Sequence, residues 1–281
     1  MTTFIADARI ARGYAGRPFL HRQVMEMVQA DCPGISFANG LDVGCGAGLS
    51  AKALRLICRQ VTGMDLSEDM VAAARAACTD AACTFVCGSG EAPDFPEKTF
   101  DIVSAAGVVD WLDVNRFLSG AGRVLQNGGT LLVYDFWITD RMKDNPAYTG
   151  WWHNDYRKRF PKAAAEADAL TDAAAVSHGF RPEKQVSFVL EQPFSRAGLA
   201  DFLMLQSRVN ERIRRRGLDA EEVRRQMADS LASVCGEDVL LYFDGYYRRY
   251  IYYGDESDTG RGQERADVGG GGGALFSPSA V

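Results

Sequence analysis

NGLDVGCGAGLS, residues Asn39–Ser50, is the segment from which the expected architecture of the chain follows. An apolar run closes on Asp42, three glycines follow within five residues, and an Ala/Leu-rich helical pattern comes next. This order predicts a strand, a tight turn and a helix. Gly44, Gly46 and Gly48 permit the positive φ angles of such a reversal and carry no Cβ that would hold a ligand off the backbone. The amides at the start of the helix attract an anionic group, so the segment predicts a ligand-binding turn.

The spacing of the glycines narrows the choice of ligand. The dinucleotide fingerprint G-x-G-x-x-G would require glycine at Leu49 or at Ala51. The register here is G-x-G-x-G, with Asp42 two residues before the first glycine. It resembles the first motif of class I methyltransferases that depend on S-adenosylmethionine (SAM). The resemblance implies an α/β fold with a doubly wound, seven-stranded, mostly parallel sheet, and a SAM site in which the backbone around Cys45 holds the amino-acid end of the cofactor.

Composition limits the class of protein and partner. The chain has 281 residues, of which 47% are hydrophobic, and this predicts one α/β unit with an added lid. A net charge of -6 and a pI near 5.2 disfavour nucleic acid and anionic membrane as partners. We expect a cytoplasmic monomer or homodimer that acts on a small molecule, because no signal peptide or membrane span is recognisable. Seven cysteines and three histidines show no zinc spacing, so no metal is expected.

Two residues near the N-terminus are candidates for a cover over the cofactor. Tyr14 and Arg17 occur in YAGRP, ahead of a helical pattern that begins at Phe19 and ends before Cys32. A similar Tyr-x-x-Arg-Pro pattern precedes the first strand in relatives of trans-aconitate methyltransferase. The alternative is that this segment only packs on the sheet.

An acid closes the next expected strand, QVTGMD, at Asp65. A carboxylate about twenty residues past a glycine turn can accept hydrogen bonds from both ribose hydroxyls of a nucleotide. The alternative, a helix N-cap, falls better on Ser67, which precedes two acidic residues. We therefore predict that Asp65 binds the ribose, with Leu66 beside it in the cofactor site.

The segment Gly88–Val103, GSGEAPDFPEKTFDIV, resembles the G-D-A-E-x-L-P-F-x-x-x-S-F-D pattern of many small-molecule methyltransferases. The resemblance places Ser89, Gly90 and Glu91 in the cofactor site. Ser89 stands where an aspartate usually binds the adenine amino group. A hydroxyl can still accept that hydrogen bond, although more weakly than a carboxylate.

The next segment, AGVVDWLD at Ala106–Asp113, resembles the A-Q-A-x-H-W-F-D pattern of trans-aconitate methyltransferase-like proteins. This resemblance places Ala106 at the cofactor and Trp111 at the substrate. Asp110 stands where histidine would be, and we interpret it as a catalytic carboxylate near the reacting centre. The alternative is that Asp110 caps a helix at 112–125.

Aromatic residues crowd the segment 138–179, where the alternation of strands and helices stops. Trp151 and Trp152 are substrate-binding candidates, and His153 is a second candidate base. The alternative is an aromatic core beneath a surface helix. Gln206 lies in FSRAGLADFLMLQS, which resembles the acceptor-lining segment of the same family.

The expected organisation is a methyltransferase domain at 1–253, with a lid at about 138–180, a helical cover at about 195–234, and a disordered tail at 254–281. The expected function is methyl transfer from SAM to a nitrogen or oxygen nucleophile of a small metabolite. Carboxyl O-methylation of a small organic acid, a non-catalytic SAM-fold regulatory subunit, and SAM-binding chemistry without methyl transfer remain alternatives. A carboxylate at Asp110 would repel a tricarboxylate acceptor, so trans-aconitate itself is not expected.

Overall fold

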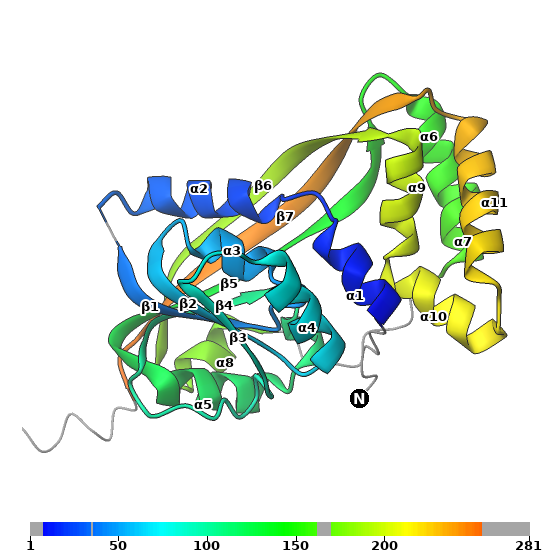
Figure 1. Cartoon of the computed structure of the whole chain (residues 1–281). Helices are drawn as coiled ribbons and strands as arrows, with labels where there is room; N and C mark the ends of the chain where they lie inside the picture. Colours follow the sequence, from blue (N-terminus) through cyan, green and yellow to red (C-terminus); the bar gives the residue numbers. More distant parts are fainter. Residues whose placement is uncertain (1–7, 35, 162–169, 255–281) are drawn as a thin grey trace, which may run out of the picture.

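The computed structural model describes residues 8–34, 36–161 and 170–254. Its centre is a seven-stranded sheet with the order β3-β2-β1-β4-β5-β7-β6 (Figure 1). Strands β1 to β5 pair in parallel, and β7 runs antiparallel to both β5 and β6. The strands are β1 Phe37–Val43, β2 Cys58–Asp65, β3 Cys83–Cys87, β4 Phe100–Ala106, β5 Leu125–Met142, β6 Phe180–Ser195 and β7 Asp238–Tyr252. The doubly wound, mostly parallel sheet predicted from the sequence is confirmed.

Helices cover both faces of the sheet. In Figure 1, α2 and α3 lie above it, and α5 and α8 lie below it. Consecutive strand residues point to opposite faces, so Leu132 and Tyr134 join one hydrophobic core while Leu131 and Val133 join the other. These helices and the neighbouring α4 are α2 His21–Asp31, α3 Leu49–Leu54, α4 Glu68–Ala77, α5 Val114–Val124 and α8 Asp172–Val176. The sequence pattern predicts a helix at 51–59 after the glycine turn, but α3 already ends at Leu54, because Cys58 pairs with Phe37 at the start of β1.

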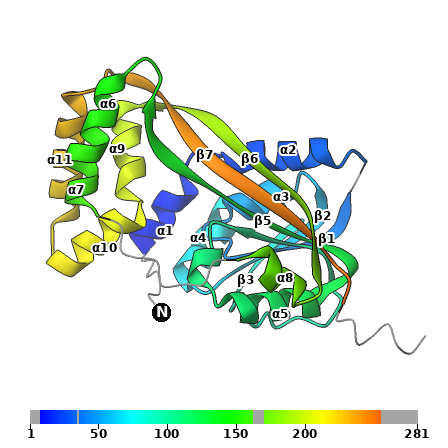
Figure 2. The ribbon, with the colours of Figure 1, turned by 180° about the vertical axis from the view of Figure 1, so that it is seen from behind.

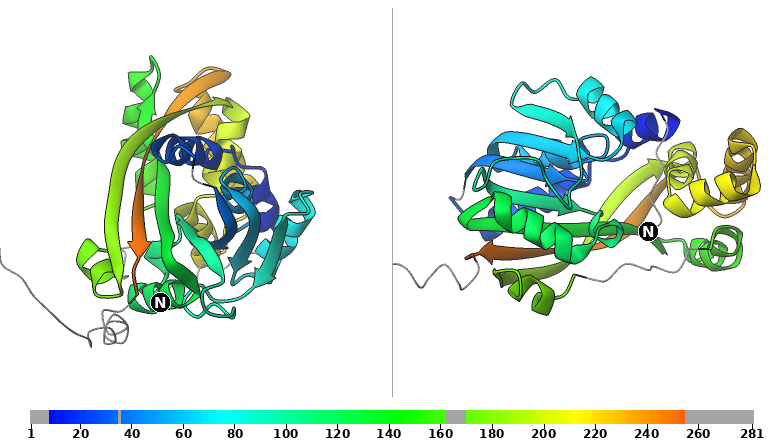
Figure 3. Two further views of the ribbon diagram at one scale, coloured as in Figure 1. Left: turned by 90° about the vertical axis from the view of Figure 1, so that its left-hand side faces the viewer. Right: turned by 90° about the horizontal axis from the view of Figure 1, so that it is seen from below.

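Strands β5 and β6 are longer than the strands that the sequence pattern predicts at 130–136 and 185–190, whereas β7 agrees with the predicted strand at 239–253 to within one residue. All three strands carry a group of helices at their far end (Figure 2). We expected β5 to end at Phe136, but pairing with β7 continues through Ile138 to Met142. The first part of the predicted lid is therefore strand. The helices beyond it, which we call the helical lobe, are α6 Pro146–Trp151, the π-helix η2 Trp152–Tyr156, α7 Arg157–Arg159, α9 Arg196–Met204, α10 Ser207–Arg216 and α11 Ala220–Ala232. Figure 3 (right) shows the yellow helices of the lobe beyond the end of the sheet.

The single helix predicted over 195–216 is wrong. The helix is interrupted after α9 because Gln206 takes an extended conformation, with φ -69° and ψ 137°. Its carbonyl then accepts the amides of Val209 and Asn210, which start α10. The predicted disordered tail, apart from Gly254, lies outside the described residues.

Helix α1, Ala8–Ala15, lies between the sheet and the lobe (Figure 1). Its buried Ile10 and Ala11 pack with Ala47 of the glycine turn and with Met70 of α4. On its other side, Arg9 donates a hydrogen bond to the side chain of Asn210 in α10, at 3.2 Å. The helix therefore connects the glycine turn to the helical lobe.

Candidate active site

The glycine turn, residues 44–48, follows β1 directly, and all three of its glycines have positive φ. The angles are 66° at Gly44, 51° at Gly46 and 89° at Gly48. A Cβ on Gly44 would lie 2.4 Å from the side chain of Val108, whereas a Cβ on Gly46 would meet nothing within 4 Å. The turn thus packs tightly against the segment after β4 and leaves space beside Gly46 for a ligand.

Asp65, at the end of β2, holds this turn in place. Its Oδ2 accepts the amide of Gly46 and its Oδ1 accepts the amide of Ser67, both at 2.9 Å. Ser67 is the N-cap of α4, as predicted, because its hydroxyl accepts the amide of Met70. Two carboxylate oxygens have about four acceptor positions, so Asp65 retains capacity for the predicted ribose contact.

Asp42 is the most deeply buried acid of the site, with no exposed surface. The hydroxyl of Ser50 donates to its Oδ2 at 2.5 Å, and its Oδ1 has no hydrogen-bond partner among the described residues. Burial raises the pKa of Asp42 to about 7, although the neighbouring hydroxyls of Ser50 and Ser104 oppose the shift. A buried carboxylate with an unpaired oxygen fits a cationic group, and SAM carries an ammonium group at its amino-acid end.

The pKa of Asp42 predicts how stability depends on pH. The folded pKa of about 7 exceeds an unfolded value near ~3.9, so the folded chain holds this proton more tightly. The free energy of unfolding should therefore fall as pH rises through this window, by roughly 4 kcal/mol from this group alone. The Asn side chain cannot ionise, so in Asp42→Asn the free energy of unfolding should decrease much less as pH rises. Urea denaturation of both proteins at several pH values between 4 and 8 measures the difference, and parallel curves would contradict the prediction.

The residues after β3 are bound largely to each other. The hydroxyl of Ser89 accepts the amide of Glu91 at 3.3 Å, and a Cβ on Gly90 would lie 2.1 Å from Val43. The carboxylate of Glu91 accepts the amide of Asp113 and pairs with Arg116 at 3.2 Å. Glu91 thus connects this loop to the start of α5, and a contact with the cofactor stays a prediction.

Leu66 is 65% exposed at the carboxyl end of β2. A large aliphatic side chain so open to solvent, next to Asp65, suits an apolar contact with a bound ring. The predicted role in the cofactor site remains open to test.

Tyr14 and Arg17 lie over the carboxyl edge of the sheet. The Arg17 guanidinium is 3.8 Å from the centre of the Tyr14 ring and 5.3 Å from that of Phe202 in α9. It also donates to the carbonyl of Leu205 at 3.2 Å, while its buried Nε has no hydrogen-bond partner among the described residues. The two residues therefore link the N-terminal segment to the lobe, above the strand ends.

Asp110 is exposed, and it lies in a 3-10 turn, Val109–Trp111, just after β4. It does not cap α5: the side chain of Asp113 does, by accepting the amide of Arg116 at 3.0 Å. The capping interpretation of Asp110 is therefore wrong, whereas its catalytic role stays a prediction. Trp111 is 42% exposed beside it, and Ala106 is the last residue of β4.

The lobe candidates lie in a different environment. Trp151 and Trp152 are 6% and 8% exposed and pack against Tyr148 and Tyr156. This placement favours the alternative of an aromatic core. His153 is exposed and pairs with Asp140 at 2.7 Å. Gln206 lies at the break between α9 and α10, next to Leu205, whose carbonyl accepts a hydrogen bond from Arg17, and its contact with substrate stays a prediction.

Sequence reasoning missed His21, Tyr134 and Asp135. His21 begins α2, and Tyr134 and Asp135 lie near the point where β5 leaves the parallel part of the sheet. Gly107, with φ 62°, brings the chain after β4 against Asp135, since a Cβ there would lie 3.0 Å from Oδ1. One signal in the sequence could have indicated Tyr134 and Asp135. They are polar residues that directly follow an apolar run in a strand, and ligands bind beyond the carboxyl ends of such strands.

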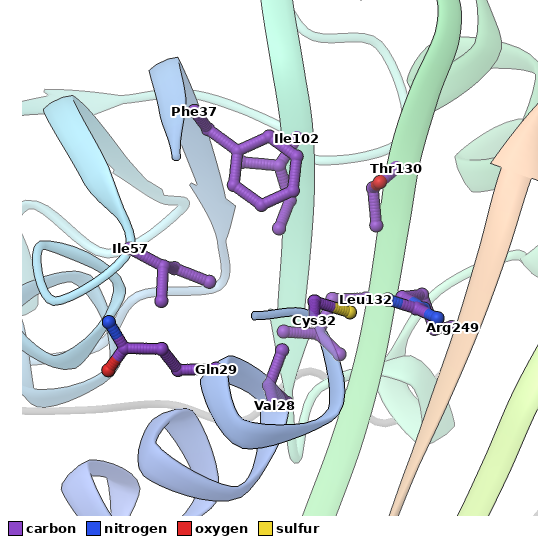
Figure 4. Close-up of a pocket in the computed structure, with 9 residues that line it drawn as sticks. All are labelled: Val28, Gln29, Cys32, Phe37, Ile57, Ile102, Thr130, Leu132 and Arg249. Carbon is purple, nitrogen blue, oxygen red and sulfur yellow. The ribbon is translucent and has the colours of Figure 1, made fainter. Parts of the chain in front are cut away.

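The cavity in Figure 4 is not this site. It is lined by residues that include Phe37 and Ile102, at the opposite end of the strands from the glycine turn. Its volume of about 10 Å³ is what a single water molecule needs. Within the described residues, no group of three or more His, Cys, Asp or Glu side chains could hold a metal ion. No helix in the described part of the chain is long and apolar enough to cross a membrane.

The sheet order, the glycine turn after β1 and the acid at the end of β2 define a Rossmann-like methyltransferase fold. Residues 41–133 match the family model described as a methyltransferase domain. A solved structure described as a candidate type II methyltransferase from Anaeromyxobacter dehalogenans has a TM-score of 0.61, at 19% identity, over 81% of this chain and 94% of that one. That likeness shows the fold.

Curated relatives match about a third of the chain. The ubiquinone biosynthesis O-methyltransferase of Bradyrhizobium sp. (strain ORS 278) is 38% identical over 96 residues, which cover 33% of this chain and 38% of that protein. The demethylmenaquinone methyltransferase of Tropheryma whipplei (strain Twist) is 37% identical over 98 residues, which cover 34% of this chain and 41% of that protein. The matches span about two fifths of each relative. The trans-aconitate methyltransferase-like subfamily suggested by the sequence is not among these matches.

Proposed function

We propose that the protein transfers a methyl group from SAM to a nitrogen or oxygen nucleophile of a small metabolite. The observation that carries the proposal is the unpaired, buried Oδ1 of Asp42 beside a glycine turn with open space at Gly46. This turn lies within the segment that matches the methyltransferase domain.

The residues present fit SAM. Asp42 would pair with its ammonium group, the turn amides and Arg17 would face its carboxylate, and Asp65 would accept the ribose hydroxyls. Leu66 and Ser89 would contact the adenine. The bound sulfonium supplies an activated methyl group, so the chain's own task is to hold the acceptor in line with it. Such orientation lowers the barrier by up to ~7–11 kcal/mol in model reactions.

Asp110 is the proposed catalytic carboxylate. It follows β4 at the carboxyl edge of the sheet, and both it and Asp135 raise the pKa of Tyr246 by their negative charge, in addition to the larger effect of burial. Asp110 and Asp135 therefore both lie close enough to Tyr246 to affect its pKa. A protonated amine or a phenol must lose its proton before attack, and an acid here can orient or accept it.

Asp110→Asn should lower kcat about 100-fold, the lower end of the range for general-base catalysis, and leave the Kd for SAM nearly unchanged. Steady-state release of S-adenosylhomocysteine and calorimetric SAM binding measure the two quantities. An unchanged kcat would remove Asp110 from the mechanism. His153→Gln, compared through the pH profile of kcat, tests the second candidate base.

The decisive experiment is an assay of S-adenosylhomocysteine release across a library of amines, phenols and carboxylic acids. Release that depends on one acceptor supports the proposed function. If SAM binds but purified protein methylates nothing until an endogenous partner is added, the regulatory-subunit alternative is correct. Product formation with intact SAM would instead indicate chemistry without methyl transfer.

A further inference from the structure

Strand β6 has a free edge. It is the last strand of the sheet and pairs with β7, and in the part of the chain that the structure describes no strand lies on its other side. Figure 3 (left) shows this yellow-green strand at the outer side of the sheet. Along such an edge the N–H and C=O groups of every second residue point outward and can pair with another chain. The other edge strand, β3, has 5 residues, whereas β6 has 16, so β6 offers much the longer row of outward groups.

The middle of this edge lacks the residues that usually keep edge strands apart. Proline and charged side chains hinder pairing between edges, and β6 carries them only near its two ends. They are Arg181, Pro182, Glu183, Lys184, Glu191 and Pro193. The residues between them, Gln185–Leu190, are uncharged and include no proline. This segment, which we call the open edge, is therefore the part of β6 that can accept a partner strand.

The side chains of the open edge alternate between a covered face and an exposed face of the sheet. The covered face belongs to a hydrophobic core and contains Val186, Phe188 and Leu190. The exposed face contains Gln185, Ser187 and Val189. Val189 leaves 54% of its surface exposed, and a β-branched side chain gains from a neighbour on an adjacent strand. A partner strand would therefore cover an apolar side chain that this chain leaves in solvent.

We propose that the open edge pairs antiparallel with the open edge of a second copy of this chain, which joins the two seven-stranded sheets across a two-fold axis. Two-fold dimers are the commonest assemblies of identical chains, and each copy contributes the same surface to the contact. The axis stands perpendicular to the sheet, because only this orientation makes the two adjacent edge strands antiparallel. Each face then stays on its own side, so opposite residues belong to the same face. The inference does not depend on the proposed methyl transfer.

The sequence of the open edge is complementary to itself in one register. With the axis at Phe188, the two Phe188 rings lie opposite each other and Val186 lies opposite the partner's Leu190. The apolar side chains of the covered face then meet, and Lys184 lies beyond them. With the axis one residue earlier, at Ser187, Lys184 would lie opposite the partner's Leu190, an ammonium group against an apolar side chain. A strand that pairs with itself must be symmetric about its centre, and the apolar symmetry about Phe188 favours a second copy over a strand of another protein.

Two positions on the exposed face test this register. With the axis at Phe188, Ser187 lies opposite the partner's Val189, and both side chains are exposed in the single chain. Sedimentation equilibrium over a wide range of protein concentrations should show a dimer and gives its dissociation constant. Ser187→Lys combined with Val189→Lys should raise that constant roughly 10-fold, because two pairs of like charges would then face each other.

Ser187→Asp combined with Val189→Lys is the matched variant. It introduces the same lysine but places a carboxylate opposite it, so the dissociation constant should return to within about threefold of wild type. Val176→Lys, at a position of α8 that is 59% exposed, controls for added positive charge and should change nothing. Thermal unfolding of all three variants should stay close to wild type, since each replaced side chain is exposed.

Any of three results from these proteins would overturn the inference. Wild-type protein that stays monomeric at every concentration forms no such dimer. An unchanged dissociation constant in the variant with two lysines assigns dimerisation to another surface. An equal loss in that variant and in the aspartate–lysine variant excludes the register about Phe188.

Hydrogen exchange tests the same contact without a substitution. The outward amides of the open edge should exchange more slowly as the concentration of wild-type protein rises, because dimerisation pairs them. Exchange that is independent of concentration would show that this edge stays in solvent or pairs only with a strand of another protein, and either outcome contradicts the inference.

Discussion

Gly44→Ala should abolish detectable SAM binding and lower the melting temperature by roughly 5–15 °C. The new Cβ would lie 2.4 Å from Cγ2 and 2.8 Å from Cβ of Val108, and a β-branched side chain cannot swing away from it. The φ of 66° adds the strain of a left-handed residue. Overpacking costs about 1–3 kcal/mol and the left-handed conformation about 1–2 kcal/mol, so we expect a loss of about 2–5 kcal/mol in the free energy of unfolding.

Gly34→Ala is the matched control for this substitution. Gly34 also has a positive φ, 85°, but a Cβ there would meet nothing within 4 Å. Gly34→Ala should lower the free energy of unfolding only by the cost of the left-handed conformation, and its affinity for SAM should equal that of wild type. Calorimetric binding and thermal unfolding of the three proteins compare them directly. Equal destabilisation by the two alanines would show that Val108 yields and that the packing argument fails.

Asp65→Ala should weaken SAM binding about 10²- to 10⁴-fold, the value of two hydrogen bonds to a charged group. The substitution removes the proposed acceptors of both ribose hydroxyls. It also leaves the amides of Gly46 and Ser67 without the carboxylate that holds them at 2.9 Å. The free energy of unfolding should fall by about 1–3 kcal/mol for the same reason.

Asp80→Ala controls for the loss of such a backbone hydrogen bond, although it also removes the ion pair of Asp80 with Arg55 at 2.9 Å. Asp80 Oδ1 accepts the amide of Ala82 at 2.9 Å, two residues on, as Asp65 Oδ1 accepts that of Ser67. It lies at the opposite end of the strands, before β3. It should therefore alter stability slightly and SAM affinity not at all. A SAM affinity in Asp65→Ala equal to wild type would exclude the ribose role.

Local signals predicted the backbone geometry of the proposed cofactor site. The positive φ at Gly44, Gly46 and Gly48 followed from glycine spacing, and the Ser67 cap followed from the acids after it. Each depends on neighbours within a few residues, which is the range over which backbone preference and capping act. Asp110 and Asp113 show the limit, because both suit a cap and only the actual start of α5 selects Asp113.

The surroundings of the proposed acceptor site depend on contacts that no local pattern encodes. Trp151 was a predicted substrate-binding residue. In the structure its side chain is buried in the lobe, and its indole donates a hydrogen bond to Ser230 of α11. The sequence gives no sign that Tyr134 differs from other buried strand residues. Its hydrogen bond with His21 joins residues 113 positions apart, so only the folded chain reveals it. Strand length was similarly underestimated, since pairing between β5 and β7 beyond Phe136 depends on residues from two distant segments.

From sequence alone came the glycine turn and the acid that closes the second strand, because glycine geometry and strand-end placement are properties of short segments. The doubly wound sheet came from the resemblance of these motifs to class I methyltransferases. Only the tertiary structure decided that β5, β6 and β7 extend into a helical lobe, that Trp151 and Trp152 are core, and that His21 lies against Tyr134. Those contacts join segments far apart in the chain, and their energy arises from burial and pairing that exist only once the chain has folded.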